Sequence, residues 1–475
     1  MLTYPMNSVK GTSMYDHLYK CIKEDILSGK LESGEKLPSK RTFAKNLGVS
    51  VITVENAYSL LASEGYIYSE EKKGYYVAKL DKWIGPEKNT PVPEEKKDIF
   101  ENNGQINKYK VDLINNIVNY ERFPFSTWSK LTRQVLSEQD EGLLRAAPSG
   151  GIAQLRESIS EYLYNYRGLT VSSDRIVIGS GTEYLYGILV KLTGRDRIYA
   201  VEDPGYYKVS RILEDNDVRC VHIAIDEYGM RVDELDKKNA DIIHLTPSHH
   251  FPTGIVMPIQ RRLELLDWAY ESEDRYIIED EYDCEFRYLG KPVQTLSDID
   301  RRGHVIYINT FSKTLAPSFR ISYMVLPDRL MERYVDTMSY MSCTVPNLDQ
   351  YVLAKFIKEG YYERHINRMR VIYRGIRNRF VTAVRNNSTY GKYINIMEEN
   401  AGLHFLIKVQ TLLEDKELIK KAESVGLGIR CLSDYAYDKA SVSKHIIIIN
   451  YSGIREDNID EAVGLLGEII EKFHS

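Results

Sequence analysis

The chain has 475 residues, a length that predicts two to four domains and excludes a single small module. Hydrophobic residues make up 43% and charged residues 28% of it, which excludes a disordered or fibrous protein. The longest wholly aliphatic run, residues 446–449, is too short for a membrane helix, and the first residues lack the features of an export signal. The five cysteines are scattered without a metal or disulfide pattern. We therefore expect a cytoplasmic protein with no membrane contact and no metal site.

The charge is unevenly distributed along the chain. The net charge of −5 argues against indiscriminate nucleic-acid binding. Residues 1–80 nevertheless hold eleven basic and nine acidic residues, a net +2, which leaves −7 for the rest. This asymmetry favours a DNA-binding head on an acidic body.

The segment between head and body, residues 81–110, has three prolines and alternating charges but no apolar period. We interpret it as a linker between a head at residues 1–80 and a body at residues 111–475. Fully extended, it would span roughly 90 Å, enough to carry the head to a partner subunit. Alternatively, parts of it lie along the body.

The head has the pattern of a winged helix-turn-helix. Residues 13–28 place apolar side chains at helical spacing and predict a first helix. Ser39 can cap a second helix over residues 40–47, and after a glycine turn Ser50 can cap a third that runs to about Glu64. Two short segments around a basic tip then predict a β-hairpin. A tight pair of helices followed by such a hairpin is a winged helix.

In such a unit the last helix enters the major groove, while basic residues on the preceding helix and on the hairpin hold phosphates. The candidate DNA contacts are Ser39, Lys40, Arg41, Ser50, Thr53, Asn56, Lys72 and Lys73. Residues 13–78 resemble the GntR superfamily of bacterial repressors and activators. That superfamily usually places an arginine early in the recognition helix, and residues 50–56 have none. We therefore expect base readout from Ser50, Thr53 and Asn56, with Arg41 as the main basic anchor. The alternative is a winged helix used only for protein contacts.

The body has the pattern of an α/β fold. Short runs rich in Ile and Val end in polar residues or glycine, which predicts buried strands. Helical stretches such as residues 152–166, 183–192 and 260–270 lie between them, so the sheet should be mainly parallel. Ligands bind such sheets at the carboxyl ends of the strands.

Residues with distinctive chemistry follow these strand ends. Lys313 in a closed site would be desolvated and competent to form a Schiff base. Asp280 follows an apolar run and would need a cationic partner, which a protonated pyridine nitrogen supplies. Tyr282 would lie on the same side and could donate to a phenolate oxygen. Tyr206 could stack on a flat heterocycle.

A phosphate site is the remaining part of the pattern. Its candidates are Gly181, Thr182 and Glu183, which open a helix after a strand, together with Thr310, Ser312 and Arg320. With the lysine, the aspartate and the tyrosines, they describe a pyridoxal 5′-phosphate pocket, in which Lys313 is the catalytic residue. Taken singly, each has an ordinary explanation, such as a surface lysine, an exposed acidic edge or a common turn.

The order and spacing of these residues resemble the fold type I aminotransferases over nearly all of residues 111–475. The resemblance implies a large domain with a mainly parallel sheet, a smaller C-terminal α+β domain and pyridoxal phosphate as cofactor. There are two departures. Phe251 stands where these enzymes carry an asparagine that binds the cofactor ring oxygen, and His249 or His250 is the candidate to replace it. The late strand around residues 444–454 lacks their carboxylate-binding arginine.

Arg430 is our candidate to bind the carboxylate of an effector, because a guanidinium suits that group. A surface salt bridge is the alternative role. Lys208 could add a second positive charge but is not expected to be essential.

A GntR-type head on an aminotransferase-like body resembles the MocR/GabR family of bacterial transcription regulators. The resemblance implies a head-to-tail homodimer that binds a double-stranded DNA operator and senses pyridoxal phosphate or a small amine or amino acid. We hypothesise that external aldimine formation at Lys313 shifts a two-state arrangement of heads and bodies. One alternative is an active aminotransferase with an appended DNA-binding domain, and another is a dimerisation scaffold without cofactor. The missing asparagine and the displaced arginine favour a sensor over an enzyme.

Overall fold

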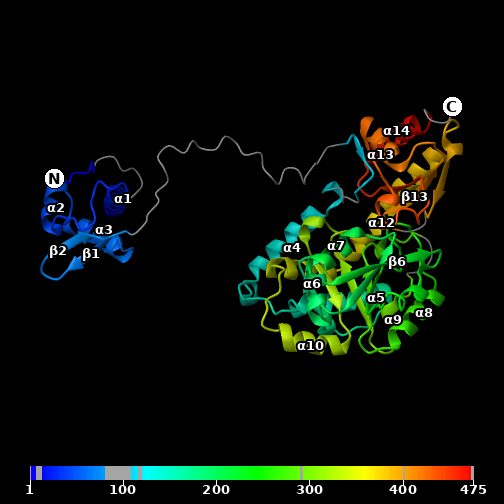
Figure 1. Cartoon of the computed structure of the whole chain (residues 1–475), viewed down its shortest axis with the longest axis horizontal. Helices are drawn as coiled ribbons and strands as arrows, with labels where there is room; N and C mark the ends of the chain where they lie inside the picture. Colours follow the sequence, from blue (N-terminus) through cyan, green and yellow to red (C-terminus); the bar gives the residue numbers. More distant parts are fainter. Residues whose placement is uncertain are drawn as a thin grey trace. The chain divides into compact units, whose positions relative to one another are not determined.

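The computed structural model describes residues 2–6, 13–80, 109–115, 120–288, 293–398 and 402–471. The chain divides into two compact units, residues 1–105 and 106–475 (Figure 1). The predicted linker lies outside the described residues except for residues 109–110, so its extent stays a prediction. Among the helices described, none has the length and apolar character needed to cross a membrane.

The head has the predicted order of elements. It consists of α1 (Met14–Leu27), α2 (Lys40–Leu47), α3 (Val51–Ser63), β1 (Ile67–Glu70) and β2 (Gly74–Val77), the two strands forming an antiparallel hairpin. Gly48 ends α2 in the left-handed conformation, at φ 67°, which allows the tight turn into α3. All these elements contribute to one apolar core, so the head is a separate hydrophobic unit.

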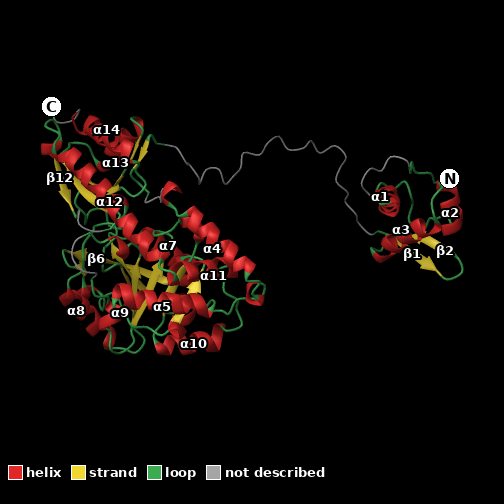
Figure 2. Cartoon of the chain, turned by 180° about the vertical axis from the view of Figure 1, so that it is seen from behind, coloured by secondary structure: helices red, strands yellow, loops and turns green. Residues whose placement is uncertain are grey.

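The large domain is built on an eight-stranded sheet in the order β4-β11-β10-β9-β8-β5-β6-β7 (Figure 2). The strands are β4 (Ile176–Gly179), β5 (Ile198–Asp203), β6 (Arg219–Asp226), β7 (Gly229–Met230), β8 (Ile242–Leu245), β9 (Tyr276–Glu281), β10 (Val305–Thr310) and β11 (Ser322–Val325). β5, β6, β8, β9 and β10 run parallel, and β11 is antiparallel to both of its neighbours. The predicted mainly parallel sheet is confirmed.

Helices cover both faces of this sheet. They are α4 (Phe125–Ser137), α5 (Ala153–Arg167), α6 (Thr182–Thr193), α7 (Tyr207–Asp215), α8 (Ile259–Tyr270), α9 (Leu296–Ile299), α10 (Asp328–Met338) and α11 (Asn347–Lys358). Side chains alternate between the faces along each strand. Ile278 and Ile306 pack with α6, α7 and α10, whereas Ile277 and Val305 pack with α8 and α9. Tyr307 lies on the second face and packs with α5 and α11.

The smaller C-terminal domain has an antiparallel sheet in the order β12-β13-β16-β15. Its strands are β12 (Ile394–Met397), β13 (His404–Val409), β15 (Arg430–Cys431) and β16 (Ile446–Asn450), and its helices are α13 (Asp415–Ser424) and α14 (Ile459–Glu471). The short β14 (Leu427–Gly428) pairs with β3 (Val111–Asp112) at the start of the body. The long α12 (Tyr361–Arg385) shares one hydrophobic cluster with both domains. The α+β character expected for this domain is confirmed.

A buried arginine fixes the loop that follows β8. Arg262 on α8 is 1% exposed and donates to the carbonyls of Met257 at 3.0 Å, Pro247 at 2.9 Å and Gln294 at 2.7 Å. Its guanidinium also lies 3.8 Å from the buried carboxylate of Glu279. Because this loop carries candidate site residues, Arg262 links the packing of α8 to the geometry of the site.

We expect Arg262→Leu to lower the free energy of unfolding of the body by about 3–5 kcal/mol, since it leaves three carbonyls without their donor and removes the cation beside the buried carboxylate of Glu279. Urea unfolding followed by circular dichroism measures this loss. The control is Arg211→Leu, which removes an exposed guanidinium 3.5 Å from Glu214 and should cost less than about 0.5 kcal/mol. Equal losses of stability in the two variants would contradict the role of Arg262 in fixing the loop after β8.

Candidate functional site

Three successive carboxylates on β9 have separate environments. Glu279 accepts hydrogen bonds from the backbone amides of Leu296 at 2.7 Å and Ser297 at 2.9 Å. Glu281, on the same face, pairs with the buried Arg167 at 3.1 Å. Asp280 lies on the opposite face because side chains alternate along a strand. An exposed acidic edge, one reading of this sequence, is therefore excluded.

Asp280 has one satisfied and one unsatisfied oxygen. Its Oδ2 accepts a hydrogen bond from the Tyr186 hydroxyl at 3.0 Å and lies 3.5 Å from His244 Nε2. Its Oδ1 is buried and has no hydrogen-bond partner among the described residues. A buried carboxylate oxygen without a donor is costly, so this atom marks a place for a ligand with a donor.

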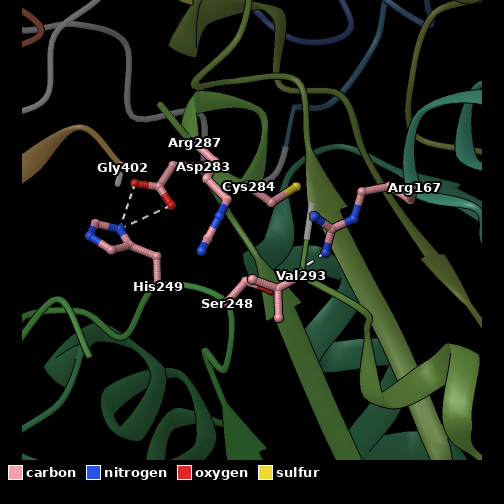
Figure 3. Close-up of a pocket in the computed structure, with 8 residues that line it drawn as sticks. All are labelled: Arg167, Ser248, His249, Asp283, Cys284, Arg287, Val293 and Gly402. Carbon is pink, nitrogen blue, oxygen red and sulfur yellow. Dashed lines mark hydrogen bonds and ion pairs between the residues drawn. The ribbon is translucent and has the colours of Figure 1, made fainter. Parts of the chain in front are cut away.

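Tyr282 joins a buried chain of polar groups. Its hydroxyl donates to the backbone carbonyl of His249 at 3.0 Å and lies 3.1 Å from Nδ1 of the His249 side chain. The carboxylate of Asp283 lies 3.0 Å from that Nδ1, and Figure 3 shows the two side chains facing each other beside a small cavity (Figure 3). Burial first, then the neighbouring carboxylates, raise the pKa of Tyr282, so the phenol is protonated and can donate. Of the two histidines considered for the asparagine's place, His249 contacts Tyr282.

His249, Asp283 and His404 bring potential metal-ligand atoms within 4.8 Å of one another. Asp283 contacts Nδ1 of His249, and within the described part of the chain the ring's other nitrogen, Nε2, has no hydrogen-bond partner. His404 Nε2 lies 3.1 Å from the carbonyl of Pro252. These three side chains and the hydroxyl of Tyr282 thus form one cluster of buried polar groups.

His250 points to a different partner. Its Nδ1 lies 2.6 Å from the Thr253 hydroxyl, and its Nε2 lies 3.4 Å from the Glu202 carboxylate. Burial lowers the pKa of His250 to about 3, with the neighbouring histidines adding to the effect. Burial raises the pKa of Glu202 to about 8 against two hydrogen bonds from Thr246. Both groups are therefore mainly uncharged at neutral pH.

Lys313 follows β10 and has no hydrogen bond or ion pair in the described part of the chain. Its pKa is lowered, first by burial and then by the positive charge of Lys208, while the carboxylate of Asp283 opposes the shift. Its charge also helps to lower the pKa of His404. The lysine thus lies among groups from the ends of several strands, and its lowered pKa favours the free amine compared with an ordinary lysine.

The predicted phosphate site forms at the start of α6. No side chain caps this helix, so the amides of its first turn, at Thr182 and after, are available. Gly181, at φ 96°, precedes it, and a Cβ there would overlap the guanidinium of Arg320. Thr310 Oγ1 lies 3.0 Å from Ser312 Oγ and accepts a hydrogen bond from Ser322 at 2.8 Å. The predicted phosphate-binding residues that follow β4 and β10 thus lie in one region of the body.

Two cations of this site converge on one carboxylate. Arg320 and Lys208 both form ion pairs with Glu183. Partial burial would raise the pKa of Glu183, but the hydrogen bond from Lys208 and the charge of Arg320 lower it overall. The sequence interpretation placed Glu183 with the phosphate, and the structure places it as the anion that holds the two cations.

Tyr206 lies between the phosphate site and Asp280. Burial around its hydroxyl, then Tyr207 and the charges of Asp280 and Glu183, raise its pKa to about 12. The residue as a whole is 45% exposed, and its ring meets Phe251 edge-on at 5.7 Å. Phe251 also meets Tyr435 at 5.1 Å, so aromatic side chains line this edge of the site.

Arg430 reaches the same aromatic edge from the small domain. It lies opposite Ile448 in the register of β15 and β16, which places a guanidinium beside the late strand that lacks one. It is half-buried and has no carboxylate partner in the described ranges. Burial raises the pKa of Tyr435, and the charge of Arg430 opposes this, so the two side chains are close. No carboxylate among the described residues pairs with Arg430, so the alternative of a surface salt bridge finds no support there.

In the head, hydroxyls expected to contact DNA are used for capping. Ser39 Oγ accepts from the amide of Thr42 at 3.2 Å, and Ser50 Oγ accepts from the amide of Thr53 at 3.1 Å. The Thr53 hydroxyl lies 2.8 Å from Ser50 Oγ. Ser50 and Thr53 are thus occupied with each other, whereas Asn56 is exposed on the outer side of α3.

The basic residues of the head differ in their pairing. Lys40 pairs with Glu55 at 2.7 Å, and Lys73 pairs with Glu70 at 3.0 Å. Arg41 and Lys72 are exposed and have no ion-pair partner among the residues described. Lys72 stands at the hairpin tip with φ 61°. Arg41 and Lys72 are thus the cations most available to phosphates.

Comparisons with known proteins agree with this two-part organisation. Residues 108–464 match the family "Aminotransferase class I and II", and residues 14–77 match "Bacterial regulatory proteins, gntR family". The HTH-type transcriptional regulator YdeL of Bacillus subtilis is 36% identical over 96% of this chain and 97% of its own length. The probable rhizopine catabolism regulatory protein MocR of Rhizobium meliloti is 30% identical over 95% of this chain and 93% of its own. The chain belongs to the MocR-type family of transcription regulators.

A solved structure supports the fold of the body. The kynurenine aminotransferase of Pyrococcus horikoshii superposes with a TM-score of 0.67 and 25% identity over 76% of this chain and 91% of its own. That protein was crystallised with pyridoxamine phosphate, its substrates and its products. The body of the MocR-type regulator therefore has the fold of a pyridoxal-phosphate-dependent family.

The residues present fit that cofactor at both ends. Asp280 Oδ1 is an unsatisfied acceptor that suits a protonated ring nitrogen. Gly181 leaves room where a side chain would meet Arg320, beside the uncapped start of α6. Lys313, whose pKa burial lowers, supplies an amine in the same site.

Sequence reasoning missed several residues that complete the site. Tyr186 and His244 hold Asp280 but lie on other elements, α6 and β8. The lone histidine within the apolar run of β8 was a usable signal, because a polar residue there must find a buried partner. Tyr186 and Asp283 carried no such local signal.

We expect the amine of Lys313 to titrate at a lower pH than an ordinary lysine, because burial and Lys208 disfavour its charged form. Acetylation by acetic anhydride across a pH series, followed by peptide mass spectrometry, gives the midpoint for each lysine. The control is the exposed Lys191 on α6 in the same sample. A midpoint for Lys313 at or above that of Lys191 would be the contrary result.

Proposed function

We propose that this MocR-type regulator binds pyridoxal phosphate through Lys313 and changes its hold on DNA when the cofactor or an amine effector occupies the site. The observation that carries the proposal is the buried Oδ1 of Asp280, which has no hydrogen-bond partner among the residues that the structure describes. A buried acceptor without a donor costs free energy, and a ligand that donates a hydrogen bond to this oxygen would remove that cost.

The site residues divide the work of holding such a ligand. Bound pyridoxal phosphate supplies an aldehyde that reacts reversibly with amines. Burial lowers the pKa of the Lys313 amine, which favours the uncharged form that reacts with an aldehyde. Asp280 would stabilise a proton on a ring nitrogen, and Tyr282, oriented by His249, would present a protonated hydroxyl to the ligand. Tyr206 and Phe251 cover the aromatic edge.

The phosphate end works by exchange of anions. Arg320 and Lys208, which pair with Glu183, would hold a phosphate in its place, and the amides at the start of α6 would donate to the same group. Glu183 therefore competes with the ligand for these cations. This competition lowers the affinity, which suits a protein that must respond to changing ligand concentration.

Arg430 selects effectors that carry a carboxylate. Its guanidinium is half-buried, without a carboxylate partner in the described part of the chain, and close to the aromatic edge of the site. A carboxylate there would form a bidentate, charge-assisted pair. We infer that amino acids act more strongly than simple amines.

The regulator acts as a homodimer whose two heads engage two half-sites of an operator, head-to-tail with respect to the bodies. Paired half-sites match the symmetry of a dimer, and a winged head by itself contacts only one of them. Arg41 and Lys72 supply the phosphate contacts in each head.

An active aminotransferase is the second candidate function, and the presence of Lys313, Asp280, Tyr282 and Arg320 favours it. An enzyme of this kind converts an amino acid into a keto acid. Incubation of the protein with pyridoxal phosphate and a panel of amino acids, followed by keto-acid detection, separates this candidate from a sensor without turnover.

We expect Lys313→Ala to abolish the visible absorbance of lysine-bound cofactor and to leave operator affinity unresponsive to ligands. For the natural protein, the affinity for DNA upstream of its own gene should shift about fivefold or more when cofactor and effector are added. Fluorescence anisotropy of the labelled duplex measures the shift. Lys191→Ala is the matched control and should retain it. A natural protein whose DNA affinity never changes would contradict the sensing proposal.

We expect Glu183→Gln to bind pyridoxal phosphate about fivefold more tightly, because the neutral amide no longer competes for Arg320 and Lys208. Quenching of the protein's intrinsic fluorescence during a titration gives the dissociation constant. Glu161→Gln, at an exposed position on α5, should leave it unchanged. Weaker binding by Glu183→Gln would show that Glu183 supports the site instead of competing for it.

A further inference from the structure

The outer side of the recognition helix α3 presents apolar side chains at its start. Val51 is 43% exposed and Ile52 is 67% exposed, whereas the inner side buries Val54, Ala57 and Tyr58 in the core of the head. Other apolar residues of the head are also exposed, but on α3 only Leu60, 36% exposed near the far end, joins Val51 and Ile52 among the exposed large apolar residues described. Two β-branched aliphatic residues are thus exposed to water at the first turn of this helix, where contact with another molecule would bury them.

The polar groups near them are largely engaged. Ser50 and Thr53 hydrogen-bond to each other and to the cap of the helix. The Glu55 carboxylate pairs with Lys40 at 2.7 Å. Asn56 is the nearby exposed side chain with both donor and acceptor groups. The start of α3 therefore offers mainly methyl groups and one amide.

The surroundings of this surface are suited to DNA. Lys40 contacts Glu55 on α3 and lies 5.4 Å from the ring centre of Tyr75 on β2, so α2, α3 and the hairpin share this side of the head. The unpaired Arg41 lies next to Lys40 in α2, and the unpaired Lys72 lies at the hairpin tip. Cations around an apolar helix start match a major groove lined by phosphates.

We propose that Ile52, supported by Val51, reads the 5-methyl groups of thymines in the operator, and that Asn56 reads an adjacent adenine. This rests on the proposed DNA-binding function. In the major groove the 5-methyl group distinguishes thymine from the other bases, and aliphatic side chains recognise it by contact. An asparagine amide pairs with N6 and N7 of adenine. The operator half-site should therefore contain A·T pairs where the start of α3 enters, in place of a guanine read by an arginine.

The test replaces single methyl groups in the DNA. The full-length protein selects its best duplex from a synthetic library with a randomised centre. Each thymine of that duplex is then exchanged for deoxyuridine, which removes the methyl group and keeps the base pair. We expect about fourfold weaker binding at one or two thymines in each half-site, the value of one buried methyl group, and less than twofold at the others.

Variants of the protein assign the effect to Ile52. In Ile52→Ala, the same exchanges should change binding less than twofold, because the contact is already lost. The matched control is Leu60→Ala, which truncates a side chain of α3 that is 36% exposed at the far end of the helix and should keep the natural sensitivity. Ile52→Val, a smaller change, should keep part of it, and thermal melting of each variant shows that the head is folded.

The experiment distinguishes a failure of the proposed thymine recognition from a failure of DNA binding itself. If the natural protein selects a duplex but no thymine is sensitive to the exchange, or if Ile52→Ala keeps the sensitivity, this inference is wrong while DNA binding stands. If the natural protein selects no duplex, the proposed DNA-binding function has failed as well.

Discussion

The alternation of side chains along β9 is the constraint on which the site depends. It sends Glu279 and Glu281 to one face, where backbone amides and Arg167 satisfy them, and Asp280 to the other. Tyr186 uses one oxygen of Asp280, and the other has no partner among the described residues. A buried acceptor without a donor costs free energy. A ligand that supplies the donor removes that cost, so binding at this atom also stabilises the folded body.

The two ends of the site are charged in opposite senses. Asp280 supplies an anion at one end, and Arg320 with Lys208 supplies cations at the other. A ligand with a protonated ring nitrogen and a phosphate has the complementary pattern. Lys313, whose pKa burial lowers, belongs to the same site. The electrostatics of the site therefore favour a ligand of this polarity and fix its direction.

The sequence predicted the frame of this molecule well, because strand and helix periods and the residues at strand ends are local signals. It identified the winged helix and the mainly parallel sheet, and the structure brings Lys313 and Asp280 to neighbouring strand ends as expected. It could not show which partner each group would find. The choice of His249 over His250, and the pairing of Glu183 with two cations, depend on residues far apart in the chain. Ser50 and Thr53 were expected to read bases, but their hydroxyls face each other at the helix cap.

The position of Arg430 connects the ligand site to the arrangement of the two body domains. Arg430 belongs to the small domain, yet the segment that follows it is fastened to the large one. The carbonyl of Tyr435 accepts from the amide of Gly205 at 3.0 Å, and Asp203 accepts from the amide of Tyr437 at 2.8 Å. Asp203 is the last residue of β5, and Gly205 lies in the loop after it, which also carries Tyr206. A carboxylate held by Arg430 would therefore act on the contact between the domains as well as on the cofactor, because the same short segment serves both. This gives an amino-acid effector a physical means of changing the body that a simple amine lacks.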